Sequence, residues 1–290
     1  RSSDGKYRFN ADGNTTRQPW FGCACCPSNL CRFIPSLPGY MYATDNSSVY
    51  VNLFADNEAQ MTVNGKGVTL KQTTRYPWDG DISIKVKQNK AGRFAMKIRI
   101  PGWARGEAVP SSLYSFTDKN VKGGFRVTVV DGKKEIDVTT AGINKGYLTV
   151  DRKWKKGDEV RIHFDMPVRE IVADSHVMAD RGRVAIQRGP LVYCAETADN
   201  KGHDVLHTVM PKNATFSIVD NYRIENTESG AGAFSVTALT VPTQTIDTTA
   251  DGKWKLSDVK LTMIPYYAWN HRGTTRMCVW MPQTPDMLDE

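Results

Sequence analysis

The chain has 290 residues and a formal net charge of +7, from 38 lysines and arginines against 31 aspartates and glutamates. Hydrophobic residues make up 40% of it, and no apolar run approaches the roughly 18 residues of a membrane-spanning helix, so the composition indicates globular domains. The basic residues are spread along the sequence, whereas a nucleic-acid surface usually shows them in a concentrated stripe. We therefore expect neither nucleic acid nor a membrane as a partner.

Residues 20–33 (WFGCACCPSNLCRF) are the most distinctive stretch, because they carry four of the six cysteines within nine positions. A short helix is predicted here. Pro27 suits a first helical turn, and Ser28 and Asn29 are residues that favour a helix start. Pro35 and Pro38 are expected to end the helix. Apolar residues recur at helical spacing along it, at Leu30, Phe33, Ile34 and Leu37.

The thiols of this stretch therefore lie at or just before a helix N-terminus, where the positive end of the helix dipole favours a thiolate. A thiolate is both the metal-binding and the nucleophilic form of cysteine. From the residues alone, Cys25 and Cys26 are either such a pair or structural thiols, and Cys23 is either a further metal ligand or a bystander. Cys31 falls on the helix and is expected to pack. Trp20 and Phe21, beside the thiols, are candidates for the wall of an active site.

After Pro38 the sequence changes to short alternating runs bounded by Gly, Asp, Asn and Pro, which is typical of antiparallel sandwiches. The pairs Asn64-Gly65 and Asp131-Gly132 are hairpin signals. We predict a mainly β chain with two consecutive antiparallel β-sandwich domains, over residues 39–166 and 167–290. The predicted strands are 48–54, 59–63, 82–87, 95–100, 126–130, 147–150 and 160–164, then 166–172, 184–187, 191–195, 215–219, 234–241, 260–265 and 277–281.

The predicted helix has no evident partner for its apolar face in this β-rich remainder, and helices derive most of their stability from packing such a face. Residues 1–38 are therefore expected to be the last piece of an upstream helical domain. Elsewhere, Cys194 and Cys278 lie in apolar runs and are expected to be buried, as are most of the tryptophans. His203 and His207 are expected in a surface loop, without a catalytic role.

Several motifs, in order along the chain, together resemble the glycoside hydrolase family 127, the β-L-arabinofuranosidase family. The cysteine segment resembles that family's signature, and the other matches extend almost to the end of the chain. They are residues 20–29 (WFGCACCPSN), 76–80 (YPWDG), 99–103 (RIPGW), 146–158 (GYLTVDRKWKKGD), 188–193 (RGPLVY), 264–270 (IPYYAWN) and 277–282 (MCVWMP).

The resemblance implies an (α/α)6 barrel that carries the active site, followed by two β-sandwich domains, so the predicted helix would be the last of that barrel. It implies that Cys25 is the nucleophile of a retaining glycosidase and that Cys25 and Cys26 bind zinc. It also implies that the other zinc ligands, a glutamate and a cysteine, and the glutamate acid/base lie upstream of this motif. If the chain begins at Arg1, the site is incomplete and the polypeptide alone is expected to be inactive.

Two rival interpretations stay open: a non-catalytic β-sandwich module for carbohydrate binding or for packing against a catalytic barrel, and a thiol-redox or structural zinc protein. The carbohydrate substrate and the upstream barrel are the expected partners. The sugar and its linkage are not readable from these motifs. A periplasmic or secreted location suits an enzyme that degrades polysaccharides, and a cytoplasmic one is equally compatible with the residues.

Overall fold

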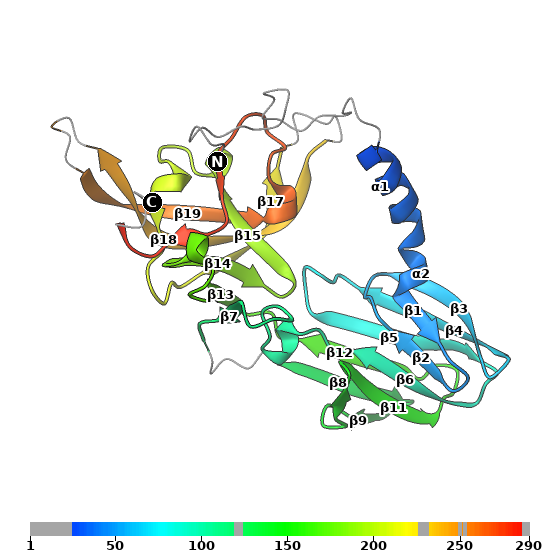
Figure 1. Cartoon of the computed structure of the whole chain (residues 1–290). Coiled ribbons are helices and arrows are strands. Elements are labelled where there is room, and N and C mark those ends of the chain that lie inside the picture. Colours follow the sequence, from blue (N-terminus) through cyan, green and yellow to red (C-terminus); the bar gives the residue numbers. More distant parts are fainter. Residues whose placement is uncertain (1–24, 119–123, 226–231, 249–250, 252–253, 286–290) are drawn as a thin grey trace. The chain divides into compact units, whose positions relative to one another are not determined.

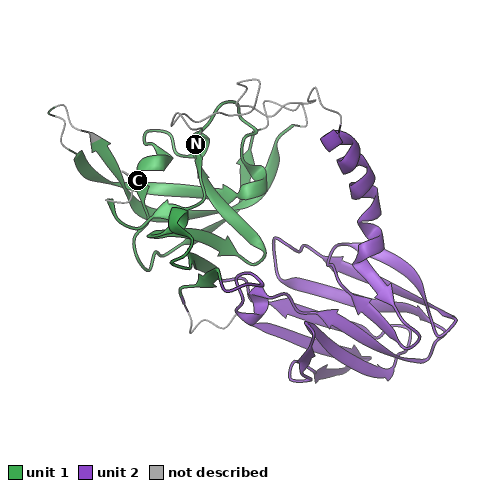
Figure 2. Ribbon diagram, viewed as in Figure 1, with its two compact units in different colours: residues 1–22, 113–117, 168–290 green, residues 23–112, 118–167 purple. Residues whose placement is uncertain are grey.

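The computed structural model describes residues 25–118, 124–225, 232–248, 251 and 254–285, which form two compact units (Figures 1 and 2). Unit 2 comprises the described residues within 23–112 and 118–167, and unit 1 comprises those within 113–117 and 168–290. The predicted mainly β class is confirmed: three sheets form the two units, and a short helix precedes them.

Unit 2 consists of two sheets whose buried faces form a common core. The five-stranded sheet has the order β1-β2-β6-β11-β10, and the six-stranded sheet has the order β3-β4-β5-β12-β8-β9. A 3₁₀ turn, η1 (Trp103–Arg105), follows β6. The strands are β1 (Tyr42–Thr44), β2 (Ser48–Val51), β3 (Asn57–Val63), β4 (Lys66–Thr74), β5 (Asp81–Asn89), β6 (Arg93–Arg99), β8 (Phe125–Asp131), β9 (Lys134–Asp137), β10 (Ile143–Asn144), β11 (Tyr147–Lys153) and β12 (Glu159–Phe164).

Strand pairing in unit 2 departs from the fully antiparallel prediction at one place. Strands β2 and β6 are parallel, with Val49 opposite Met96, while the other strand pairs of this unit are antiparallel. The chain reaches β6 from β2 by passing through β3, β4 and β5 of the other sheet, and a parallel pair needs such a long crossover. The alternation of apolar residues along the sequence predicts where each strand lies, but it does not predict which other strands pair with it.

One of the two predicted hairpin turns is confirmed, and the other lies one residue further along the chain. The turn at Asn64-Gly65 is confirmed: both residues have a positive φ, of 50° and 68°, as a type I′ turn requires. In the second hairpin Asp131 pairs with Lys134, so the two-residue loop is Gly132-Lys133 and not Asp131-Gly132. The positive φ of 61° falls on Gly132 as the first loop residue.

Unit 1 is built on one ten-stranded sheet, with β16-β18-β19-β15-β14-β13-β7 as its main path and β17, β20 and β21 attached to β18, β15 and β14. The four 3₁₀ turns of this unit are η2 (Met178–Asp180), η3 (Thr197–Asp199), η4 (Val205–His207) and η5 (Tyr266–Ala268). The strands are β7 (Tyr114–Phe116), β13 (Val168–Ala173), β14 (Arg183–Arg188), β15 (Leu191–Glu196), β16 (Thr208–Val209), β17 (Ser217–Ile224), β18 (Phe234–Thr248), β19 (Trp254–Pro265), β20 (Met277–Cys278) and β21 (Met281–Pro282).

Both faces of this sheet carry a hydrophobic cluster. Along β15, Tyr193 and Ala195 belong to one cluster and Cys194 to the other, as the alternation of side chains in a strand dictates. Strand β7 is a difference from the sequence prediction, since it lies in the range assigned to the first sandwich but pairs with β13 of unit 1.

Candidate functional site

The candidate site begins at helix α1 (Cys25–Ser36), which has Pro27 in its first turn, as predicted. Ser28 and Asn29 lie inside the helix, not at its start. Their side chains donate to the carbonyl oxygen of Cys25, Ser28 Oγ at 3.2 Å and Asn29 Nδ2 at 2.8 Å. Both are local bonds to a preceding carbonyl oxygen, of the kind that Ser and Asn side chains commonly form.

The far end of α1 lies where the two prolines were expected to end it, at Ser36, between Pro35 and Pro38. Pro35 is accommodated one residue before the end of α1, so the missing N–H removes a hydrogen bond only from the last turn. Pro38 does not end the helical path but occupies the first turn of a second short helix, α2 (Pro38–Met41), which leads into β1.

The Sγ atoms of Cys25 and Cys26 lie 3.8 Å apart, and both residues are exposed in the first turn of α1. Two thiolates bound to one tetrahedral zinc, each about 2.3 Å from the metal, are separated by about 3.8 Å. The spacing of this pair therefore fits two corners of such a site. Two corners do not complete one, because no group of three or more His, Cys, Asp or Glu side chains suited to a metal occurs among the residues that the structure describes.

Three further residues predicted for the site, Cys23, Trp20 and Phe21, lie outside the described residues. Cys31 is exposed, so the expectation that it packs is not met in this chain. It shares this exposure with the rest of the helix, because no residue of α1 is buried.

The apolar face of α1 is exposed to solvent. This was predicted, because the rest of the sequence contains no evident packing partner for it. Leu30, Phe33 and Ile34 are 56%, 54% and 59% exposed, and Tyr40 of α2 is 59% exposed. A soluble protein rarely leaves a contiguous group of large apolar side chains in water without a partner. The helix thus presents both the two thiols and an exposed apolar surface.

The two remaining cysteines lie in unit 1 and are unsuited to chemistry. Cys194 is fully buried, and burial raises the pKa of its thiol far above the ordinary range. Cys278 is mostly buried; burial raises its pKa to about 11, and its thiol donates to the carbonyl oxygen of Trp280 at 3.3 Å. Both thiols are protonated at neutral pH, which agrees with the structural role predicted for them.

The predicted burial of the tryptophans is confirmed for some of them and not for others, and one histidine lies at the surface as predicted. Trp154 is 3% exposed and donates through Nε1 to the carbonyl oxygen of Phe94 at 3.0 Å, which confirms a core role. Trp78 and Trp254 are 42% and 62% exposed, so these two do not have the core position expected for most of the tryptophans. Among the histidines, His207 ends the 3₁₀ turn η4 and is exposed.

A buried ionic group in unit 1 was not predicted from the sequence. Arg272 donates through Nη1 and Nη2 to the two carboxylate oxygens of Asp199, each at 2.6 Å, and through Nη2 to Glu196 at 2.5 Å. The side chains of Glu196 and Asp199 are 0% exposed. We call these three residues the carboxylate–arginine cluster.

Neighbouring residues add hydrogen bonds to the two carboxylates of this cluster. Tyr222 donates to Asp199 at 2.7 Å, and the backbone N–H of Asn270 donates to Glu196 at 3.0 Å. Burial, followed by the bond to Asp199, raises the pKa of Tyr222 to about 12. Because the two carboxylates share the Arg272 guanidinium, the cluster holds the segment after η5 against η3, and it has the character of a structural clamp. The charged residues of this cluster lie in or beside turn-like segments of the sequence, and no pattern in such segments predicts that a charged residue is buried.

Two family matches cover most of the chain. Residues 48–166 match the family described as beta-L-arabinofuranosidase, GH127 middle domain, and residues 168–282 match the glycoside hydrolase family 127 C-terminal domain. The chain contains the middle and C-terminal domains of glycoside hydrolase family 127. Both family 127 matches begin after the cysteine segment, so they do not extend to Cys25 and Cys26.

Individual family 127 proteins agree with this assignment. The chain is 31% identical over 291 residues to a non-reducing end beta-L-arabinofuranosidase of Bifidobacterium longum subsp. longum, covering 91% of this chain and 38% of that protein. It is similar to a solved GH127 beta-arabinofuranosidase (TM-score 0.83, 44% identity, 94% of this chain and 40% of that chain). It is also similar to a GH127 beta-L-arabinofuranosidase from Geobacillus stearothermophilus (TM-score 0.75, 33% identity, 92% and 39%).

The chain thus spans about two fifths of the length of these relatives. In the part of the chain that the structure describes, no helix is long and apolar enough to cross a membrane.

Proposed function

We propose that this chain is the C-terminal part of a retaining glycoside hydrolase that acts on β-L-arabinofuranosides or related sugars, with Cys25 as its nucleophile. The activity named for the relatives supports the substrate class. The observation that carries the nucleophile assignment is the pair of exposed thiols in the first turn of α1, with their Sγ atoms 3.8 Å apart.

Cys25 and Cys26 would hold zinc, with Cys23 as a further candidate ligand, and the remaining ligands would come from a part of the protein outside this chain. The fit of the 3.8 Å spacing to a tetrahedral zinc site supports this proposal. When bound, zinc keeps a coordinating thiol deprotonated at neutral pH. The N-terminal end of α1 favours the same charge on these sulfurs.

In the proposed reaction the Cys25 thiolate attacks the anomeric carbon of the sugar, and a C–S bond forms as the C–O bond to the leaving group breaks. The leaving oxygen takes a proton from an acid that lies outside this chain. Water then attacks the same carbon and gives a proton to the conjugate base of that acid, the C–S bond breaks, and the thiolate is regenerated. Two successive inversions give net retention of configuration. Trp20 and Phe21 are proposed as part of the wall around the sugar.

The rest of the site is proposed to lie in an upstream helical barrel, of which residues 1–38 form the last part, with β domains over residues 39–166 and 167–290. The exposed apolar face of α1 supports this, because packing against preceding helices would bury Phe33 and Ile34. The isolated chain is proposed to be inactive, since the described residues contain no complete metal site.

The test uses the longer protein, with hydrolysis of an aryl β-L-arabinofuranoside and the zinc content as separate readouts. Cys25→Ser should lower kcat by at least about a thousandfold, while the matched variant Cys31→Ser should retain activity. Cys26→Ala should lower the zinc content measured by elemental analysis. Full activity of Cys25→Ser would overturn the nucleophile assignment, and an unchanged zinc content in Cys26→Ala would overturn the ligand assignment.

A further inference from the structure

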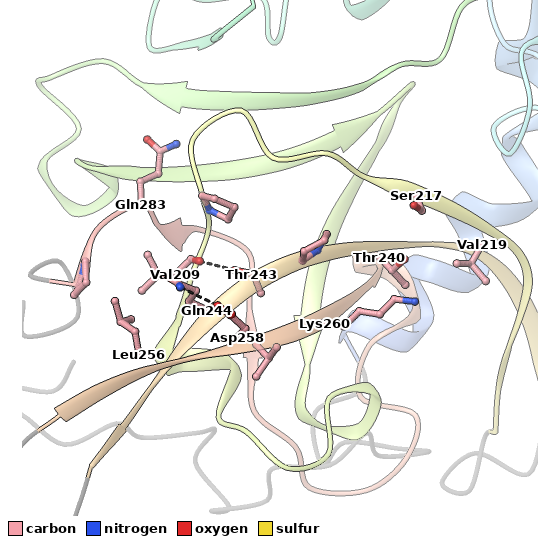
Figure 3. A pocket seen from close by; sticks show the side chains of 14 residues that line it. Val209, Ser217, Val219, Thr240, Thr243, Gln244, Leu256, Asp258, Lys260 and Gln283 are labelled. Atoms are coloured by element: carbon pink, nitrogen blue, oxygen red, sulfur yellow. Dashed lines mark hydrogen bonds between the residues drawn. The ribbon is translucent and has the colours of Figure 1, made fainter.

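A groove with a volume of about 1140 Å³ lies on unit 1 (Figure 3). It forms because β16 and β17 pair with the same edge of β18 at different heights. Val209 of β16 lies opposite Gln244, and Ser217 of β17 lies opposite Thr240. The positions of β18 between these two pairings have no strand beside them on that edge, and the groove opens there.

Polar side chains from two adjacent strands line the groove. Cross-strand register places Gln244 of β18 opposite Asp258 of β19, and Gln244 Nε2 donates to Asp258 Oδ1 at 2.9 Å. The next pair along the same face is Pro242 and Lys260. Since side chains alternate along a strand, these even-numbered positions share one face of the sheet.

The same face continues to an exposed tryptophan. Trp254 is four positions before Asp258 in the unbroken register of β19, so it lies on the groove's face, and it is 62% exposed. Trp254 and Lys260 are six positions apart, a span of about 20 Å at about 3.4 Å per residue. The face is therefore long enough for an extended chain of several sugar units.

The exposed aromatic ring and the polar groups beside it indicate which kind of ligand the groove can bind. An exposed aromatic ring can stack on the C–H face of a sugar, and the amide, hydroxyl and carboxylate groups beside it can bind sugar hydroxyls. The groove carries one acidic and one basic side chain, Asp258 and Lys260, so it has no excess charge to attract a polyanion. Half of the fourteen lining residues are apolar and half are polar, and the charged Asp258 and Lys260 lie opposite Gln244 and Pro242. The groove therefore lacks the continuous, charge-depleted apolar centre that is typical of a protein-binding patch.

We propose that this groove, extended by Trp254, binds a neutral polysaccharide that carries L-arabinofuranosyl units. Its role is to retain the protein on polymeric substrate. The choice of sugar rests on the proposed function, but the binding itself does not depend on the cysteine chemistry.

The test is affinity electrophoresis of this chain in native gels that contain debranched arabinan, arabinoxylan or, as a polyanion, polygalacturonate. Retardation by arabinan or arabinoxylan is expected, with little effect of polygalacturonate. Trp254→Ala should weaken binding about tenfold, which corresponds to about 1.4 kcal/mol, and Gln244→Ala should weaken it to a smaller extent. Trp78→Ala, which removes an exposed tryptophan of unit 2, is the matched control and should bind as the unmodified chain does.

The proposal is overturned if neither neutral polymer retards the chain, if Trp254→Ala binds as tightly as Trp78→Ala does, or if only polygalacturonate retards it. Circular dichroism of each variant separates a loss of binding from a loss of folding. Cys25→Ser should be retarded as strongly as the unmodified chain. If Cys25→Ser still binds the polysaccharide but the longer protein with this substitution shows no turnover, binding by the groove does not depend on catalysis by Cys25. Either proposal can then fail without the other.

Discussion

The carboxylate–arginine cluster gives the sharpest prediction about stability. Arg272→Leu removes the only guanidinium bonded to Glu196 and Asp199 within the residues that the structure describes, while it conserves much of the side chain's apolar volume. Two carboxylates that are 0% exposed would then lack a counter-charge. Burying a charge without a partner costs far more than removing a pair from the surface.

The magnitude follows from the three charge-assisted bonds, of 2.5–2.6 Å, that are lost. Breaking a buried pair by removal of one partner costs about 3–5 kcal/mol. At about 2–4 °C per kcal/mol for a domain of this size, the melting temperature of unit 1 should fall by about 6–20 °C. The matched control is Arg93→Leu, whose ion pair with Asp151 is exposed and should contribute less than about 1 kcal/mol.

Scanning calorimetry of Arg272→Leu and Arg93→Leu at pH 7 tests this prediction. A loss no larger than that of Arg93→Leu at pH 7 would refute the interpretation of the cluster as a clamp.

Three further predictions concern local features. Gly80→Ala should strongly destabilise unit 2 in urea denaturation, because a Cβ there would lie 1.9 Å from the carbonyl oxygen of Phe164, whereas Gly67→Ala, with nothing within 4 Å, should be tolerated. Ile34→Ala on the exposed face of α1 should change the free energy of unfolding of this chain by less than about 0.5 kcal/mol, and a loss of 2 kcal/mol or more would show that the face is packed. Alkylation of Cys278 by iodoacetamide should stay slow at pH 8 and accelerate towards pH 11, since only the thiolate reacts; fast labelling at pH 8 would contradict the raised pKa.

Local patterns predicted the β fold well. Every strand run predicted for unit 2, from 48–54 to 160–164, overlaps an observed strand, because alternation and turn residues act within a few positions. The parallel pairing of β2 with β6 could not be predicted in this way, since it depends on which strands meet across the fold. The three-residue β7, within a serine-rich stretch, is too short to produce a periodic signal.

The candidate site was predictable in part. The cysteine pattern pointed to Cys25 and Cys26, and the spacing of Leu30, Phe33 and Ile34 predicted a helix face without a partner. The carboxylate–arginine cluster was not predictable, because Glu196 and Arg272 are 76 positions apart and meet only in the folded sheet. The groove at β18 likewise depends on two strands that share one edge, which no local pattern encodes.

The central claim is that Cys25 forms a covalent bond with the sugar. It is tested most directly by peptide mass spectrometry of the longer protein after acid quenching during turnover of a slow arabinofuranoside. The account predicts a pentosyl adduct on the sulfur of Cys25, present in Cys31→Ser and absent in Cys25→Ser. An adduct on a carboxylate, or turnover with inversion of configuration and no adduct, would contradict it.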